Sequence, residues 1–173
     1  MKFNKSLLTA ALLAAGSLTV ANAAPITTDQ FDVLLTVDSV CAIVTGATQD
    51  INLGTVAAGE AQMPAFTKTG STTITTNCSK GATAKITLKP VSTNSANGTG
   101  KLLGGTSGAE EVAYKLTSVS KDGDAWGTTT PVTTAAALNY ATPIITTVYA
   151  TVTSTADVTP GAYKDTVNVS VTF

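Results

Sequence analysis

The 173-residue sequence contains no histidine and no arginine, and only 12% of its residues are charged. The absence of histidine excludes the Ser–His and Cys–His nucleophile systems and removes the nitrogen ligand that most zinc sites use. The absence of arginine removes the side chain that makes most bidentate contacts with bases and phosphates. The ten lysines form no cluster, so the sequence argues against a nucleic-acid partner.

The residues that are abundant favour a β-protein. Thr, Ser, Ala, Val and Gly dominate, and 43% of the residues are hydrophobic. The hydrophobic fraction is too high for a disordered chain. β-branched residues with few charges are typical of strands with a neutral, hydroxyl-rich surface. The length is sufficient for one domain with a hydrophobic core.

The first 23 residues have the features of a secretory signal peptide. Lys2 and Lys5 precede an apolar run at residues 7–20, and Ala21-Asn22-Ala23 is an A-x-A cleavage signal. We expect cleavage after Ala23, because a cut one residue later would place a proline just beyond it. An uncleaved membrane anchor is the alternative, but the apolar run is short and rich in alanine. The mature chain would keep eight lysines against eleven acidic residues, a net charge of −3.

Two cysteines, Cys41 and Cys78, are present. In an exported chain, an isolated pair predicts one disulfide bond. Two free thiols or a metal site are the alternatives, but no histidine is available to complete a set of metal ligands. We therefore expect a disulfide, no metal and no cofactor.

Apolar and polar residues alternate in several short stretches, which is the period of a strand with one buried face. Region 91–108, rich in Ser, Asn, Gly and Thr, is interpreted as a long loop or an irregular hairpin, and 131–138 as holding an uncertain short strand. The other strands are expected at residues 31–38, 39–44, 51–53, 71–78, 82–90, 112–119, 144–153 and 167–173.

This arrangement predicts an all-β fold, an immunoglobulin-like β-sandwich. An up-and-down barrel is the alternative, but a barrel requires no special arrangement at its two ends. Here both ends of the mature chain are alternating strands. The last one carries Val167, Val169, Val171 and Phe173 on one face, and no further strand follows it.

A complete immunoglobulin sheet would continue with one more strand beside residues 167–173. We therefore expect a sandwich that lacks its last strand and has a groove with an open sheet edge, which is an aggregation hazard unless it is filled. The N-terminal arm, residues 24–38, has the pattern of a strand that could fill such a groove in a neighbouring molecule. Its expected donor residues are Phe31, Val33, Leu35 and Val37.

The end of the sequence carries a family resemblance. Residues 160–173 read PGAYKDTVNVSVTF, which resembles the G-x-Y-x-D-x-[apolar]-x-V-x-[apolar]-x-[aromatic] close of the spore coat protein U-like domain. That family includes the major pilins of archaic chaperone–usher pili. Phe31-x-Val33 ahead of Cys41, Ile51-Asn52-Leu53-Gly54 and Asn77-Cys78 agree with it. The resemblance covers residues 31–173, and the long Thr/Ser/Gly middle departs from it.

The resemblance implies a structural pilus subunit that is exported through the periplasm to the cell surface. Residues 39–173 would form the incomplete domain, completed by donor-strand complementation from another copy of the subunit. A periplasmic chaperone and an outer-membrane usher are the implied partners, and adhesion and biofilm formation the implied roles. The implied acceptor-groove and chaperone-recognition residues are Tyr163, Val167, Val169, Val171 and Phe173.

Three other features of the sequence are weaker indications of function. The acidic pair Glu110-Glu111 is the one candidate acid–base pair, and Asp122-Gly123-Asp124 resembles a fragment of a calcium loop without the glutamate at position twelve. Trp126 could form a platform for a sugar or could cap the edge of the core. The alternative function is therefore a secreted binding module that recognises a carbohydrate or a host surface, and we expect no enzymatic activity.

Overall fold

The computed structural model describes residues 28–44, 49–57 and 67–173. The expected signal peptide lies outside these residues. The chain divides after Thr36 into two units, of which the second, Val37–Phe173, holds every strand that the structure describes. The described part of the first unit, residues 28–36, contains no helix or strand.

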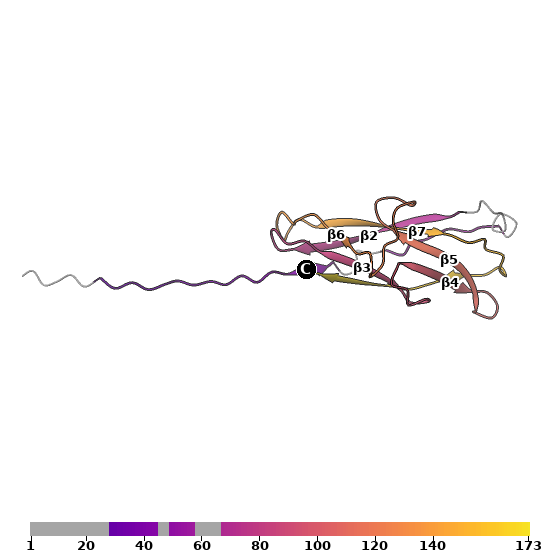
Figure 1. Ribbon diagram of the computed structural model, residues 1–173, viewed down its shortest axis with the longest axis horizontal. Coiled ribbons are helices and arrows are strands. Elements are labelled where there is room, and N and C mark those ends of the chain that lie inside the picture. Colours follow the sequence, from indigo (N-terminus) through magenta and orange to yellow (C-terminus); the bar gives the residue numbers. More distant parts are fainter. Residues whose placement is uncertain (1–27, 45–48, 58–66) are drawn as a thin grey trace, which may run out of the picture. The chain divides into compact units, whose positions relative to one another are not determined.

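The second unit is built from antiparallel strands (Figure 1), and its described residues contain no helix. The strands are β1 (Cys41–Ile43), β2 (Thr69–Cys78), β3 (Lys85–Pro90), β4 (Thr99–Gly104), β5 (Glu110–Thr117), β6 (Val132–Thr133), β7 (Ile144–Val152), β8 (Tyr163–Lys164) and β9 (Val167–Thr172). They form a six-stranded sheet in the order β1-β2-β7-β5-β4-β8 and a three-stranded sheet in the order β6-β3-β9.

The core lies between the two sheets. In β2, β3 and β5, buried inward-facing positions alternate with partly buried ones, so that the six-stranded sheet contributes Ile74 and Leu116, and the three-stranded sheet contributes Ile86 and Leu88. Each of these four side chains is at most 1% exposed. Two separate sheets enclosing one core confirm the predicted all-β, immunoglobulin-like architecture and differ from the single closed sheet of a barrel.

The predicted disulfide is present between Cys41 and Cys78, with a sulfur–sulfur distance of 2.08 Å. The two cysteines lie directly opposite each other in the β1–β2 ladder. The bond thus fixes the short edge strand β1 to the long strand β2. Cys78 is fully buried in the core.

Several predicted elements differ from the structure. Residues 31–38 and 51–53 alternate as expected but are not assigned to strands, because alternation alone cannot supply a hydrogen-bonded neighbour. The region interpreted as a loop or irregular hairpin, 91–108, contains β4, whose two glycines weaken its pattern. The strand expected within 131–138 is reduced to the two residues of β6.

Candidate functional site: an apolar groove beside the last strand

The last strand, β9, lies at the edge of the smaller sheet. On one side β9 pairs with β3, and Val169 lies opposite Leu88 in this ladder. On the other side, no strand among the described residues pairs with it. Val167, Val169 and Val171 are half-buried and pack against the core, while the residues between them are exposed. The alternation in the sequence therefore gives β9 one apolar face turned toward the interior, as predicted.

Phe173 follows the end of β9 and keeps 63% of its surface exposed. It is therefore a large aromatic side chain at the edge of the sandwich that the described residues do not cover. The prediction that it takes part in the groove or binds a chaperone stays a prediction.

A groove of about 1190 Å³ opens beside β9. Val167 and Val169 line it from the smaller sheet, and Ile51 and Leu53 line it from the segment that follows β1. This segment lies against β2, where a Cβ atom at Gly70 would come within 2.7 Å of Ile51 Cγ2. Further apolar lining comes from the inner faces of both sheets: Ile74, Leu88, Leu102, Val112, Leu116, Val148, Ala150 and Val152.

These inner-face residues are part of the hydrophobic core or pack against it. The groove therefore continues the hydrophobic core to the surface of the sandwich. A cleft with this volume and apolar lining suits an extended strand that inserts alternate apolar side chains between the two sheets.

One end of the groove carries polar residues around β8. The Tyr163 hydroxyl donates a shared hydrogen bond to the Thr159 carbonyl oxygen, at 2.6 Å, and to Glu110 Oε2, at 2.9 Å. Glu110 also accepts hydrogen bonds from the backbone N–H and the hydroxyl of Thr159. The hydrogen bond from the Thr159 hydroxyl is the main cause that lowers the pKa of Glu110, against an opposing effect of burial.

A second polar cluster surrounds Asp165, between β8 and β9. Its carboxylate accepts hydrogen bonds from the Tyr114 hydroxyl at 2.7 Å, from the Ser92 hydroxyl at 2.5 Å and from the Ser92 backbone N–H at 3.0 Å. Burial, together with the hydrogen bond to Asp165, raises the pKa of the Tyr114 hydroxyl well above its usual range. Tyr114, Tyr163 and Asp165 all line the groove.

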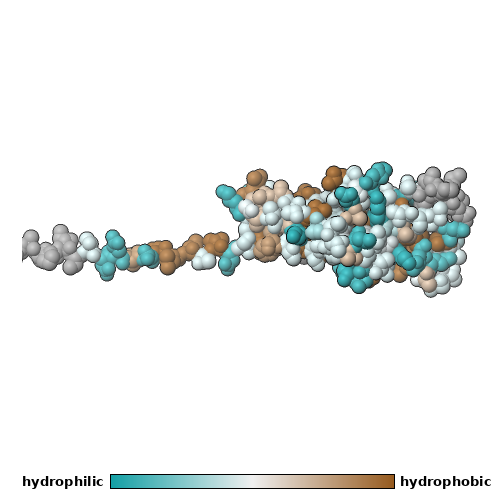
Figure 2. Space-filling model, in the orientation of Figure 1, coloured by the Kyte–Doolittle hydropathy of each residue, from teal (hydrophilic) through white to brown (hydrophobic). Residues whose placement is uncertain are grey.

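The proposed donor residues are exposed. Phe31, Val33, Leu35 and Val37 retain 81–88% of their surface, and hydrophobic residues gather along this segment in Figure 2. Leu34, on the opposite face of the alternation, is equally exposed. Large apolar side chains in succession without cover are unusual for a soluble segment.

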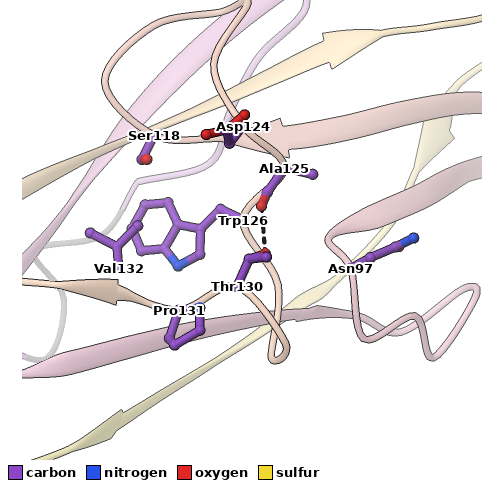
Figure 3. Close-up of a pocket in the computed structure, with 8 residues that line it drawn as sticks. All are labelled: Asn97, Ser118, Asp124, Ala125, Trp126, Thr130, Pro131 and Val132. Atoms are coloured by element: carbon purple, nitrogen blue, oxygen red, sulfur yellow. Dashed lines mark hydrogen bonds between the residues drawn. The ribbon is translucent and has the colours of Figure 1, made fainter.

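Trp126 is part of the core. It is 1% exposed, and its indole N–H donates a 2.9 Å hydrogen bond to the Ile86 carbonyl oxygen. A separate pocket of about 460 Å³ has Asp124, Thr130, Pro131 and Trp126 in its lining (Figure 3). Because the ring lies within the core, it cannot serve as a sugar platform, and the interpretation of Trp126 as a core side chain is correct.

The acidic side chains of both candidate motifs contact neighbouring side chains. Glu110 contacts Thr159 and Tyr163, whereas Glu111 forms an exposed ion pair with Lys101. Asp122 is paired with Lys121. Within the described ranges, no group of three or more acidic or cysteine side chains could hold a metal ion. In the described part of the chain, no helix is long and apolar enough to cross a membrane.

The local sequence pattern predicts β9 and its apolar face, but it does not contain most of the lining of the groove. The motif Tyr163-Lys164-Asp165 places two polar side chains at alternate positions ahead of β9. Their partners, Glu110 and Tyr114, lie more than 50 positions away in the chain. Such long-range partners depend on sheet topology and are not contained in a local pattern.

The comparisons agree with this architecture. The family model of the Spore Coat Protein U domain matches residues 27–170, so the chain belongs to that family. No curated protein matches the sequence. A solved structure, a CsuC–CsuE chaperone–tip adhesion subunit pre-assembly complex from archaic chaperone–usher Csu pili of Acinetobacter baumannii, contains a chain with the same fold. The TM-score is 0.53 at 19% identity over 80% of this chain and 41% of the other.

Proposed function

We propose that this chain is a structural subunit of a chaperone–usher pilus and polymerises by donor-strand exchange. The observation that supports this most strongly is the groove of about 1190 Å³ beside β9, which is lined by apolar residues from the inner faces of both sheets. The membership of the Spore Coat Protein U domain family and the likeness to a chain of a Csu pre-assembly complex agree with it.

The N-terminal arm, residues 24–38, is the proposed occupant of the groove in another copy of the subunit. Phe31 and Val37 are six residues apart, as are Val167 and Phe173, so the apolar faces of the arm and of the last strand have equal lengths of about 20 Å when extended. Four apolar side chains would be buried. Their burial could contribute about 6–12 kcal/mol, an upper bound before the cost of ordering the arm.

Because the groove and the arm are different surfaces of the same molecule, the contact is head-to-tail and does not close. Repetition of the contact produces a fibre. Before assembly, a periplasmic chaperone would occupy the groove and contact Phe173, and an outer-membrane usher would exchange the chaperone strand for the next arm. This mechanism places the subunit in pili at the cell surface, where adhesion and biofilm formation are the expected roles.

The arm can be tested by its removal. A chain lacking residues 24–37 should be recovered with its chaperone but should not form fibres, and unboiled surface extracts should show no ladder on electrophoresis. A full-length arm variant with Val33→Asp and Leu35→Asp should behave in the same way, because each substitution places a charge on the inserted face. Asp32→Asn and Thr36→Ser, on the opposite face, are the matched control and should preserve the ladder.

Two results would contradict the proposal. One is fibre formation by the truncated chain. The other is a stable, monomeric intact chain in the absence of any chaperone, because a subunit with an open core groove requires a strand to fill it.

A further inference from the structure

We propose that Asp165 is a positioning residue that holds the start of β9 in place and keeps the groove in the shape that accepts a donor strand. The inference rests on the proposed function and deepens it. It concerns how the groove is prepared before the donor enters, rather than which segment enters.

Asp165 lies where the chain passes from one sheet to the other. β8 pairs with β4 in the six-stranded sheet, and β9, which begins two residues after Asp165, pairs with β3 in the three-stranded sheet. Ser92 lies in another connection between the sheets, the one that joins β3 to β4. The Asp165 carboxylate accepts two hydrogen bonds from Ser92, so it joins these two connections directly.

The third hydrogen bond to Asp165 comes from the inner face of the six-stranded sheet. Tyr114 of β5 is 3% exposed, and its hydroxyl donates to Asp165 across the intervening strand β4. Gly100 of β4 lies directly opposite Tyr114 in the ladder. A Cβ atom at Gly100 would collide with the Tyr114 ring and hydroxyl, so glycine leaves the space through which the tyrosine reaches Asp165.

The result is a clasp, formed by Asp165, Ser92 and Tyr114, that ties both sheets together at one end of the groove. Val167 and Val169, which line the groove, follow Asp165 by two and four residues. Their distance from the opposite sheet therefore depends on where Asp165 is held. Two further hydrogen bonds extend the clasp, from the Lys101 N–H to the Ser92 hydroxyl and from the Val91 N–H to the Thr166 carbonyl oxygen.

A positioning role makes a specific kinetic prediction. Without a donor, β3 is the one described strand that pairs with β9, and the clasp holds the first residues of β9. When a donor strand fills the groove, it supplies a second neighbour and holds β9 itself. Loss of the clasp should therefore lower the fraction of molecules that are competent to accept a donor, which slows uptake in proportion, while the completed complex should release its donor at an unchanged rate.

The experiment uses the full-length arm variant, which cannot insert its own arm. The protein is unfolded in urea with its disulfide intact and diluted into buffer that contains a fluorescent peptide of residues 24–38, and fluorescence anisotropy follows peptide uptake. An unlabelled chase then gives the release rate. Asp165→Asn and Tyr114→Phe are compared with Glu111→Gln, a control that breaks the exposed pair with Lys101.

We expect uptake to be about tenfold slower in Asp165→Asn and Tyr114→Phe and unchanged in Glu111→Gln, with release rates within twofold of the parent in all three. Uptake at the parent rate in both clasp variants would overturn the inference. Release accelerated as much as uptake is slowed would also overturn it, because the clasp would then merely stabilise the fold. Failure of the parent protein to take up the peptide would reject the proposed function itself.

Discussion

Val169 of β9 lies directly opposite Leu88 of β3, and no described strand flanks its other side. Leu88 is 1% exposed, whereas Val169 is half-buried and lines the groove. The last strand thus packs its apolar face on the core, while no strand among the described residues pairs with its outer edge. This combination of a half-covered apolar face and an open edge is the physical basis of the proposed assembly mechanism.

A charge on the groove face of β9 should abolish recovery of the subunit. Val169→Asp would place a carboxylate among apolar side chains, where an unpaired charge is strongly disfavoured. Asn168→Asp is the matched control, since Asn168 is exposed on the other face of the same strand. Immunoblots of periplasmic extracts should show little Val169→Asp and normal Asn168→Asp. Equal amounts of the two variants would show that the face is not buried.

A methyl group at position 100 should weaken the fold by displacing Tyr114. Gly100→Ala introduces a Cβ atom into the space of the buried ring, so the ring must move and lose its hydrogen bond to Asp165. We expect a loss of about 1–3 kcal/mol, typical of overpacking, in urea unfolding of the peptide-complemented arm variant. Gly161→Ala, where a Cβ atom would make only ordinary contacts, should be close to neutral. A neutral Gly100→Ala would show that Tyr114 is not fixed in this position.

The raised pKa of Tyr114 predicts a loss of stability in alkaline solution. A tyrosine in the unfolded chain ionises near 10.0, but burial and the carboxylate of Asp165 keep folded Tyr114 protonated above that pH. Because the pKa of this hydroxyl is higher in the folded than in the unfolded chain, Tyr114 contributes stability that is fully present below pH 10. This stability is lost as the pH rises above 10. The folding equilibrium constant then falls by up to about tenfold per pH unit.

This contribution should be absent from Tyr114→Phe. The unfolding free energies of the two peptide-complemented proteins, measured in urea at pH 8, 10 and 11, should therefore converge above pH 10. A difference that stays constant with pH would contradict the burial of this hydroxyl against Asp165.

Loss of the disulfide should destabilise the subunit and lower its yield in the periplasm. Cys41 and Cys78 are 37 residues apart, and closing a loop of this size stabilises a fold by about 4 kcal/mol in the chain-entropy model. The double variant Cys41→Ser/Cys78→Ser should give a much lower periplasmic yield than the parent. A yield equal to that of the parent would show that β1 is held to β2 without the bond.

The sequence predicted those parts of the fold that depend on local pattern and covalent chemistry. The alternation in 167–173 predicted β9 and its buried face, and the isolated cysteine pair predicted the disulfide. The sequence did not predict β4 because glycine is typical of loops. Gly100 and Gly104 are needed in this strand for another reason: they leave space for the rings of Tyr114 and Tyr163.

The sequence predicted the part of the groove lining that β9 contributes, but not the part that the other strands contribute. Val167 and Val169 could be identified because they lie in one alternating run, whereas Ile51, Val112 and Val148 join them in the groove through long-range sheet pairing. The short segments 31–38 and 51–53 show the opposite error. Their alternation is real, but a strand also requires a hydrogen-bonded neighbour, which a single copy of the chain does not provide within the described residues.

The most direct test of donor-strand exchange is a cross-link between two copies. Fibres are grown from a mixture of ¹⁴N and ¹⁵N subunits in which position 35 carries a photo-activated phenylalanine, and mass spectrometry identifies the linked peptides. We expect mixed-isotope links from position 35 to groove residues such as Val169 and Ile51. Links confined to one isotope, or mixed-isotope links that avoid the groove, would contradict donor-strand exchange.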